Sequence, residues 1–152
     1  TQTHASEHAM LLSMDHSFKN QENNDDLFIK MNGRKLYEFA LTHVPHVVKT
    51  ALDMVNTHIS EISKILIHQA NEKMDEAIVQ RLFKLYDLEF TNPSVMPMSI
   101  SRLGNSSVAT IPTLLDLVLK GKIKDQSINA GDKVVFVSVG AGMNINAVVY
   151  QF

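Results

Sequence analysis

Apolar residues recur at three- and four-residue steps in three parts of the chain, which is the period of a helix with one buried face. The first part begins at Gly33, and its apolar face consists of Leu36, Phe39, Ala40, Val44, Val47, Val48, Ala51 and Leu52. Pro45 lies within this pattern. Because proline lacks a backbone N–H, we expect the helix to be kinked or interrupted there.

The second and third helical patterns carry signals at their ends. The second consists of Met74, Ala77, Ile78, Leu82 and Leu85. Asn71 stands directly before it, where a side-chain oxygen caps the first turn of a helix. The third consists of Ile111, Leu114, Leu115, Val118 and Leu119. Gly121 follows it, in the position of a C-terminal cap.

Short continuous apolar runs predict strands. They occupy Ile65–Ile67, Val134–Val139 and Ile145–Phe152, and a run at Ala9–Met14 is a further strand candidate. Leu88–Met98 contains two prolines, so we expect a loop or an irregular strand there. Helices thus alternate with strands, and the chain ends in two strands. This order predicts an α/β fold, with a mixed sheet flanked by helices and an antiparallel pair at the end.

Domain organisation and composition narrow the function classes. We expect one domain spanning 1–152, with an exposed polar loop at about 18–26 and a core at 27–152. The chain is 45% hydrophobic and 20% charged, which is typical of a globular protein. Its net charge of −2 gives no general attraction to nucleic acid or a membrane surface, and no apolar run of about 18 residues spans a bilayer. The cytoplasm is the default expectation.

Two features bear on the chain as a whole. It contains no cysteine, which excludes a disulfide, a cysteine–zinc site and a cysteine nucleophile within it. It begins at Thr1 without an initiator methionine or a signal-like apolar core, which favours a processed or excised piece.

A first polar cluster, His68–Asn71 (HQAN), follows a predicted strand. Ligands usually bind at the carboxyl ends of strands in α/β sheets. A histidine there can donate a hydrogen bond to a developing oxyanion or move a proton near neutral pH. The alternative is a histidine that caps the next helix or fills space.

Two further clusters contain small residues. Gly104–Ser107 (GNSS) precedes the third helix, and Asn105 in it can present its amide N–H to a carbonyl oxygen. The alternative is an ordinary turn with a helix N-cap. Gly140-Ala141-Gly142 connects the last two strands. Its backbone N–H groups can stabilise an oxyanion, or it is only a hairpin turn.

Four other histidines form two pairs with metal-ligand spacing. These are His4 with His8, and His43 with His46. A metal site needs three or four converging ligands, so we expect no metal at either pair.

Taken together, the motifs resemble one family. His68–Asn71 is similar to the HQAN motif, and Gly104–Ser107 to the GNTS motif, of the ketoacyl-acyl-carrier-protein synthase III condensing enzymes. Leu27–Val48 resembles the family segment that leads into the long helix, including a mid-helix proline. Other matching segments are Ile111-Pro112, Gly121–Lys124 and Gly140–Gly142. The resemblance covers Leu27 to Phe152.

The resemblance implies the C-terminal half of a thiolase-like fold. In this family a cysteine of the first half takes an acyl group from acyl-CoA. The second half then stabilises the enolate formed when malonyl-acyl carrier protein loses CO₂. By motif position, His68 and Asn105 are the catalytic residues of that step. The resemblance implies CoA and phosphopantetheine thioesters as substrates, no cofactor and a role in fatty-acid biosynthesis.

The resemblance also assigns binding roles. Gly140, Ala141 and Gly142 match the backbone oxyanion loop, with Ala141 where a glycine is usual. Residues that match the pantetheine tunnel are Gly33, Tyr37, Ala70 and Asn71. Lys73 and Arg81 lie near positions that dock acyl carrier protein, although charges on a helix also occur simply as a solvated face.

The missing cysteine leads to expectations about partners. The chain is either an excised domain or a natural half, and alone it is expected to be inactive without a cysteine-bearing N-terminal half. We expect a homodimer in the parent protein, and an exposed apolar patch on the helix from Gly33 or on the final strands. The alternative is a non-catalytic scaffold or carrier-docking module. A shared cleft for His68 and Asn105 would favour catalysis, whereas burial of either in the core would weaken it.

Overall fold

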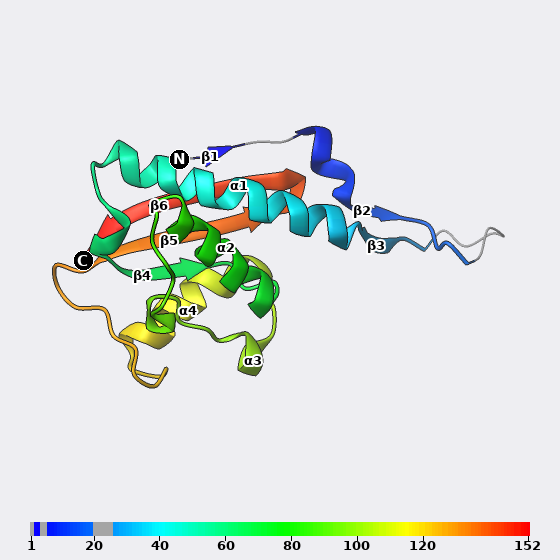
Figure 1. Cartoon of the computed structure of the whole chain (residues 1–152). Helices are drawn as coiled ribbons and strands as arrows, with labels where there is room; N and C mark the ends of the chain where they lie inside the picture. The colour runs from blue at the N-terminus through cyan, green and yellow to red at the C-terminus, as the bar shows by residue number, and fades with distance from the viewer. Residues whose placement is uncertain (1, 4–5, 20–25) are drawn as a thin grey trace.

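A mixed sheet of four strands lies at the centre of the computed structural model, which describes residues 2–3, 6–19 and 26–152 (Figure 1). In order across the sheet, the strands are β1 (Gln2–Thr3), β6 (Asn144–Gln151), β5 (Lys133–Gly140) and β4 (Ile62–Ile67). β4 pairs with β5 in parallel, and β5 pairs with β6 antiparallel. The predicted mixed sheet and terminal antiparallel pair are therefore confirmed.

Four α-helices surround this sheet. They are α1 (Gly33–Met54), α2 (Glu72–Lys84), α3 (Ile100–Leu103) and α4 (Thr110–Leu119). Short 3₁₀ turns are η1 (Ser6–Leu11), η2 (Ile59–Glu61), η3 (Pro93–Val95), η4 (Ser107–Ala109) and η5 (Ala141–Met143). The three predicted amphipathic helices are confirmed as α1, α2 and α4.

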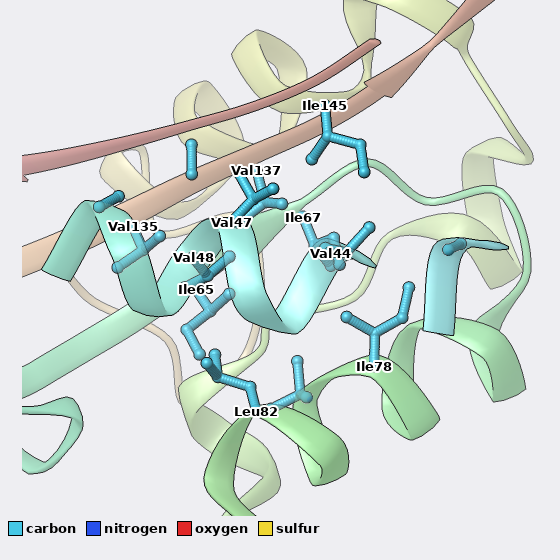
Figure 2. Packing of buried hydrophobic residues seen from close by; sticks show 14 of the residues in the cluster. Val44, Val47, Val48, Ile65, Ile67, Ile78, Leu82, Val135, Val137 and Ile145 are labelled. Carbon is cyan, nitrogen blue, oxygen red and sulfur yellow. The ribbon is translucent and has the colours of Figure 1, made fainter. Parts of the chain in front are cut away.

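The two faces of the sheet are covered by different helices. Ile65, Ile67 and Val137 belong to the larger core cluster, which includes the buried faces of α1 and α2 (Figure 2). Leu66 between them belongs to a second cluster with Leu114 of α4. Successive residues of a strand point to opposite faces, so a strand covered on both sides must be apolar throughout. This explains the continuous apolar runs in the sequence.

Helix α1 continues through Pro45, so of the two predicted outcomes, a kink or an interruption, the interruption is wrong. Pro45 has no N–H to donate to the carbonyl of Leu41, four residues before it. Arg81 of α2 replaces that donor, because its Nη1 lies 3.2 Å from the Leu41 carbonyl oxygen. The neighbouring helix thus supplies the hydrogen bond that the proline removes.

The predicted strand at Ala9–Met14 is correct only in its second half. Residues up to Leu11 form the 3₁₀ turn η1, and β2 (Leu12–Asp15) pairs with β3 (Phe28–Met31) in a separate hairpin. Strand β2 covers the four residues that pair with β3 and does not extend back to Ala9. Leu88–Met98 is a loop containing η3 rather than an irregular strand. Most of the predicted loop at 18–26 lies outside the described residues.

Exposed apolar side chains gather on the N-terminal hairpin and the turn before it. They are Met10, Met14, Phe18, Leu27, Phe28, Ile29 and Met31. Figure 1 shows β2 and β3 beyond the N-terminal end of α1, away from the central sheet. Helix α1 and the final strands, where we expected the patch, each expose only two large hydrophobic residues.

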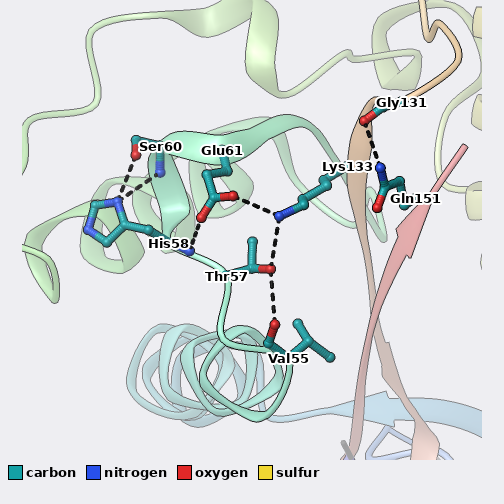
Figure 3. Close-up of polar contacts among 8 residues, drawn as sticks. All are labelled: Val55, Thr57, His58, Ser60, Glu61, Gly131, Lys133 and Gln151. Carbon is teal, nitrogen blue, oxygen red and sulfur yellow. Dashed lines mark hydrogen bonds and ion pairs between the residues drawn. The ribbon is translucent and has the colours of Figure 1, made fainter.

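Polar contacts join the ends of the strands opposite His68 (Figure 3). The carboxylate of Glu61 accepts a hydrogen bond from the backbone N–H of His58 at 2.8 Å and pairs with Lys133 Nζ at 2.7 Å. Lys133 Nζ also donates to Thr57 Oγ1 at 3.3 Å. These contacts connect η2 and the start of β4 to the start of β5.

Candidate active site

A pocket of about 520 Å³ lies at the carboxyl ends of the parallel strands β4 and β5. His68 follows β4, and its backbone N–H donates to the Val137 carbonyl at 2.8 Å, which extends the parallel pairing to the histidine. Asn105 comes from the loop between α3 and η4, and Gly140 ends β5. All three residues line this pocket, although they are far apart in the sequence.

The environment of His68 favours a neutral imidazole. The residue is half-buried, and this burial lowers the pKa of His68 below its ordinary value of 6.5. A hydrogen bond with the backbone of Ser107 raises the pKa in part. A neutral imidazole keeps one N–H donor and brings no charge of its own into the site. The side chain borders the pocket and is not enclosed in the core.

Asn105 combines a local turn with access to the pocket. Its Oδ1 accepts a hydrogen bond from the backbone N–H of Ser107 at 2.8 Å, which confirms the turn interpretation of this segment. The N-cap interpretation is wrong, since no side chain caps η4 or α4. With its oxygen oriented toward Ser107, the Asn105 amide presents Nδ2 as the remaining donor.

Gln69 positions the loop that carries Asn105, a role that sequence reasoning missed. Its side chain is fully buried at the end of β4. Nε2 donates to the Pro97 carbonyl at 2.9 Å, and Oε1 accepts from Ser99 N and Ser99 Oγ at 2.8 and 3.1 Å. The second residue of the HQAN cluster therefore connects β4 to the segment leading into α3. The sequence offered one indication of this role, namely a polar residue between two residues expected to line the pocket.

Gly140, at the end of β5, lines the pocket, and so does Met143 of the following turn η5. Gly142 is not among the described wall residues. Gly142 has φ of +73°, and a Cβ there would lie 3.2 Å from Asn144 Nδ2, so a side chain is disfavoured. Because this loop joins antiparallel strands, the hairpin interpretation is confirmed.

The four residues expected along the pantetheine tunnel are placed differently. Ala70 lines the pocket with His68. Gly33 lines an adjacent pocket of about 400 Å³, and Met31 borders both pockets. Asn71 caps α2, its Oδ1 accepting from Met74 N at 3.2 Å, as the sequence predicted. Tyr37 and Asn71 do not belong to the described walls of either pocket.

The two residues expected to dock a carrier protein also differ. Lys73 is exposed on the first turn of α2. Arg81 is exposed as well, but one guanidinium nitrogen is occupied by the Leu41 carbonyl. This contact within the chain gives Arg81 a structural role that does not require a carrier protein.

Asp75 is a buried carboxyl in the wall of the pocket, and sequence reasoning missed it. Its exposed fraction is 0%, and neither carboxyl oxygen has a hydrogen-bond partner among the described residues. Burial raises the pKa of Asp75 to about 8, and the backbone of Asn71 lowers it in part, while the charges of Glu72 and Glu76 act in the same direction as burial. Asp75 lies three residues before Ile78, which places it on the apolar face of α2. That spacing was the available signal.

Two of the four histidines that the sequence pairs pack against one aromatic ring. The rings of His8 and His43 pack on Phe39, with centroid distances of 5.3 and 4.3 Å. His4 lies outside the described residues. In the part of the chain that the structure describes, no three His, Cys, Asp or Glu side chains come together as metal ligands, and no helix is long and apolar enough to cross a membrane.

Comparisons with known proteins agree with this architecture. The model of the 3-oxoacyl-[acyl-carrier-protein] synthase III C-terminal family matches residues 52–152. Beta-ketoacyl-[acyl-carrier-protein] synthase III of Porphyra umbilicalis is 37% identical over 124 residues, which cover 82% of this chain and 35% of that protein. The protein of the same name from Acaryochloris marina is 36% identical, with 82% and 34% covered. The chain thus spans about a third of the length of these relatives.

Solved structures show the same fold. The 3-oxoacyl-(acyl carrier protein) synthase III of Pseudomonas aeruginosa has a TM-score of 0.79 at 23% identity, covering 100% of this chain and 43% of that one. The synthase III of Thermus thermophilus has a TM-score of 0.79 at 24% identity, covering 100% and 44%. The fold is therefore that of the C-terminal half of a thiolase-like enzyme, and the chain belongs to the 3-oxoacyl-[acyl-carrier-protein] synthase III C-terminal family.

Proposed function

We propose that this chain is the C-terminal catalytic half of a 3-oxoacyl-acyl-carrier-protein synthase III type acyltransferase. The reaction would be the decarboxylative condensation of an acyl-CoA with malonyl-acyl carrier protein in fatty-acid biosynthesis. The observation that carries the proposal is the single pocket lined by His68, Asn105 and Gly140 at the carboxyl ends of β4 and β5. Family membership supports it, since the similar proteins are named as synthase III enzymes.

His68 and Asn105 are proposed to stabilise an enolate. Loss of CO₂ from a malonyl thioester breaks the bond to the carboxyl carbon and leaves its electron pair on the remaining carbon and the thioester oxygen. Two neutral donors placed beforehand around that oxygen stabilise the charge as it develops. The lowered pKa of His68 suits this role, because a neutral ring brings no charge of its own, and its single N–H would turn from the Ser107 backbone to the thioester oxygen.

The condensation step requires a nucleophile that this chain does not contain, because it has no cysteine. In the proposed reaction, a cysteine thiolate of an N-terminal half holds the acyl group as a thioester. The enolate carbon attacks the acyl carbonyl, a carbon–carbon bond forms, and the thiolate leaves with the electron pair. Gly140 of the loop Gly140–Gly142 would donate its backbone N–H to the oxyanion of this step. The isolated chain would be inactive, and no cofactor is needed.

The exposed hairpin is the surface we propose for contact with the N-terminal half. Seven large apolar side chains between Met10 and Met31 are exposed there, and Met31 also borders the catalytic pocket. Packing of the other half on this surface would remove apolar area from water and close one side of the pocket. A homodimer of the complete enzyme and a cytoplasmic location are further parts of the proposal.

Substrate delivery is proposed along the residues around the pocket entrance. A pantetheine arm would pass Gly33, Tyr37, Ala70 and Asn71 to reach His68. Acyl carrier protein is acidic, and Lys73 is the exposed cation on α2 that we propose for docking, with Arg81 contributing its remaining donors.

The direct test is release of CO₂ from malonyl-acyl carrier protein by this chain assembled with a cysteine-bearing half. We expect His68→Ala to reduce the rate about 10²–10³-fold, the usual effect of losing one oxyanion donor. His46→Ala, an exposed histidine on α1, serves as the matched control and should leave the rate unchanged. Equal activity of the wild type and His68→Ala would leave a non-catalytic scaffold or docking module as the function.

A further inference from the structure

The carboxyl group of Asp75 stands out in the wall of the pocket. Met74 and Ile78, its neighbours on α2, line the same wall together with Ala70. Asp75 is fully buried, and neither of its oxygens has a hydrogen-bond partner in the described part of the chain. The backbone of Asn71 lowers the pKa of Asp75 in part, whereas Glu61 and Asp132, the other carboxylates with a resolved shift, each accept side-chain and backbone hydrogen bonds.

An unpaired buried carboxyl is costly to the fold. Leaving one buried polar group without a partner costs on the order of 1–3 kcal/mol, and an unpaired buried charge costs more. Burial raises the pKa of Asp75 to about 8, so the group is mainly a neutral acid at pH 7. A neutral carboxylic acid has one O–H donor in addition to its acceptors. At this position the donor has no acceptor among the described residues.

The charges around Asp75 do not supply a counter-ion. Glu72 and Glu76 on its own helix are both negative and raise its pKa further. Among the described wall residues of the pocket, His68 is the only other titratable side chain, and its lowered pKa keeps it neutral. The described wall residues contributed by α1, β4 and β5 contain no titratable group; they are Leu36, Ile67, Ser138, Val139 and Gly140.

We propose that Asp75 is a substrate-binding residue that donates a hydrogen bond, as the neutral acid, to an uncharged carbonyl oxygen of a pantetheine thioester in this pocket. The inference rests on the proposed function, because that function supplies the ligand class. The acceptor is either an amide carbonyl of the pantetheine arm or the carbonyl of the acyl group. Ionisation of Asp75 would remove the donor and place a negative charge against the ligand oxygen, so binding should weaken at alkaline pH.

The test measures the dissociation constant of acetyl-CoA at pH 7 and pH 9, using this chain assembled with an N-terminal half whose nucleophilic cysteine is replaced by alanine, so that the ligand is not consumed. If only the neutral acid binds, a group with a pKa of about 8 weakens apparent affinity about tenfold at pH 9. Asp75→Asn keeps a donor that does not ionise, so its affinity should be independent of pH. Asp75→Leu should bind weakly at both values, and Glu89→Gln, an exposed change in the loop after α2, should behave as wild type.

A second ligand identifies the acceptor. Desulfo-coenzyme A contains the pantetheine arm but no thiol and no acyl group. A tenfold loss at pH 9 with this ligand assigns the acceptor to the arm, whereas a loss seen only with acetyl-CoA assigns it to the acyl carbonyl.

Two results would overturn the inference while leaving the proposed function intact. One is an Asp75→Asn protein that catalyses decarboxylation but loses affinity at pH 9 as the wild type does. The other is a carboxyl pKa below about 6 for Asp75 in the assembled protein, measured by ¹³C NMR, which would mean that the other half supplies a cation. In contrast, a wild-type protein that neither binds acetyl-CoA nor releases CO₂ would overturn the proposed function itself.

Discussion

The carboxyl groups at the two ends of the parallel pair β4–β5 differ in burial, in hydrogen-bond partners and in the direction of their pKa shifts. At the start of these strands, Glu61 is exposed, pairs with Lys133 and accepts from His58, and these contacts lower its pKa. Asp132 beside it accepts from Ser63 and Asn129, and its pKa is lowered as well. At the other end, Asp75 is buried and unpaired within the described chain, and its pKa is raised to about 8.

This difference separates a structural end from a binding end. Where every polar group has a partner within the chain, nothing remains to recognise a ligand, and the contacts only fasten strands together. At the pocket end, His68, Asn105 and Asp75 retain hydrogen-bonding capacity that the chain itself does not use. Unsatisfied polar groups cost stability, and among the described residues with buried unpartnered side-chain atoms, Asp75 lines the pocket whereas Tyr86 and Gln126 do not.

The largest expected effect concerns the pH dependence of stability. The folded pKa of Asp75, about 8, lies above its ordinary value of 3.8, so the unfolded chain releases this proton first as the pH rises. Stability should therefore fall by about 1.4 kcal/mol per pH unit between about pH 4 and 8 through this group, and level off above it. Urea unfolding at several pH values should show that slope reduced in Asp75→Asn. Parallel curves for the two proteins would contradict a buried neutral acid.

The next effect concerns catalysis at the pocket end. Asn105→Ala removes one proposed oxyanion donor and should lower the decarboxylation rate of the assembled protein about 10²–10³-fold. Ser101→Ala, an exposed change on the nearby helix α3, is the control. An Asn105→Ala protein with full activity would reduce Asn105 to a turn residue.

Gln69 should matter through position and stability together. Gln69→Leu leaves the Pro97 carbonyl and the Ser99 N–H and hydroxyl without their partner, and should cost about 3 kcal/mol in the free energy of unfolding. The loop carrying Asn105 would then lose its anchor to β4. Gln80→Leu, an exposed change on α2, should be nearly neutral in the same urea titration. Similar midpoints for the two variants would show that the buried amide does not hold this loop.

Arg81 offers a smaller test of whether a docking residue is structural. Arg81→Met leaves the Leu41 carbonyl opposite Pro45 without a donor, and should lower stability by about 1 kcal/mol. Lys84→Met, exposed at the end of the same helix, provides the comparison for loss of charge alone. If the two variants unfold at the same urea concentration, the contact with Leu41 contributes nothing.

The smallest effect belongs to the paired end. Glu61→Gln should lower the urea midpoint slightly at pH 7, because exposed ion pairs contribute little. The pKa of Glu61 lies below its ordinary value of 4.5, so the stability from this pair is present above that pH and is lost as the pH falls further. The difference from wild type should therefore shrink below about pH 4. A difference that grows in acid would show that the pairing with Lys133 is not its source.

Part of the candidate site could be predicted from the sequence. The clusters His68–Asn71 and Gly104–Ser107 are contiguous, follow predicted elements and resemble family motifs, so their importance was readable one segment at a time. Asp75 and the bonds of Gln69 were missed, because burial and partners depend on segments about 30 or more residues away. For Tyr37 and Asn71 the sequence predicted too much. Their motif positions placed them in the pantetheine tunnel, but neither lines a pocket in the described structure.

The sequence by itself determined the elements that depend on local periodicity. Repeats of 3.6 residues predicted α1, α2 and α4, and continuous apolar runs predicted β4, β5 and β6, since each pattern reflects which faces of one element are covered. Only the tertiary structure decided that α1 continues through Pro45, that Ala9–Met14 divides into a turn and a hairpin strand, and that Asp75 titrates near pH 8. Each of these depends on a donor, a pairing strand or a low-dielectric surrounding that packing brings together, and none of these is encoded in the local pattern.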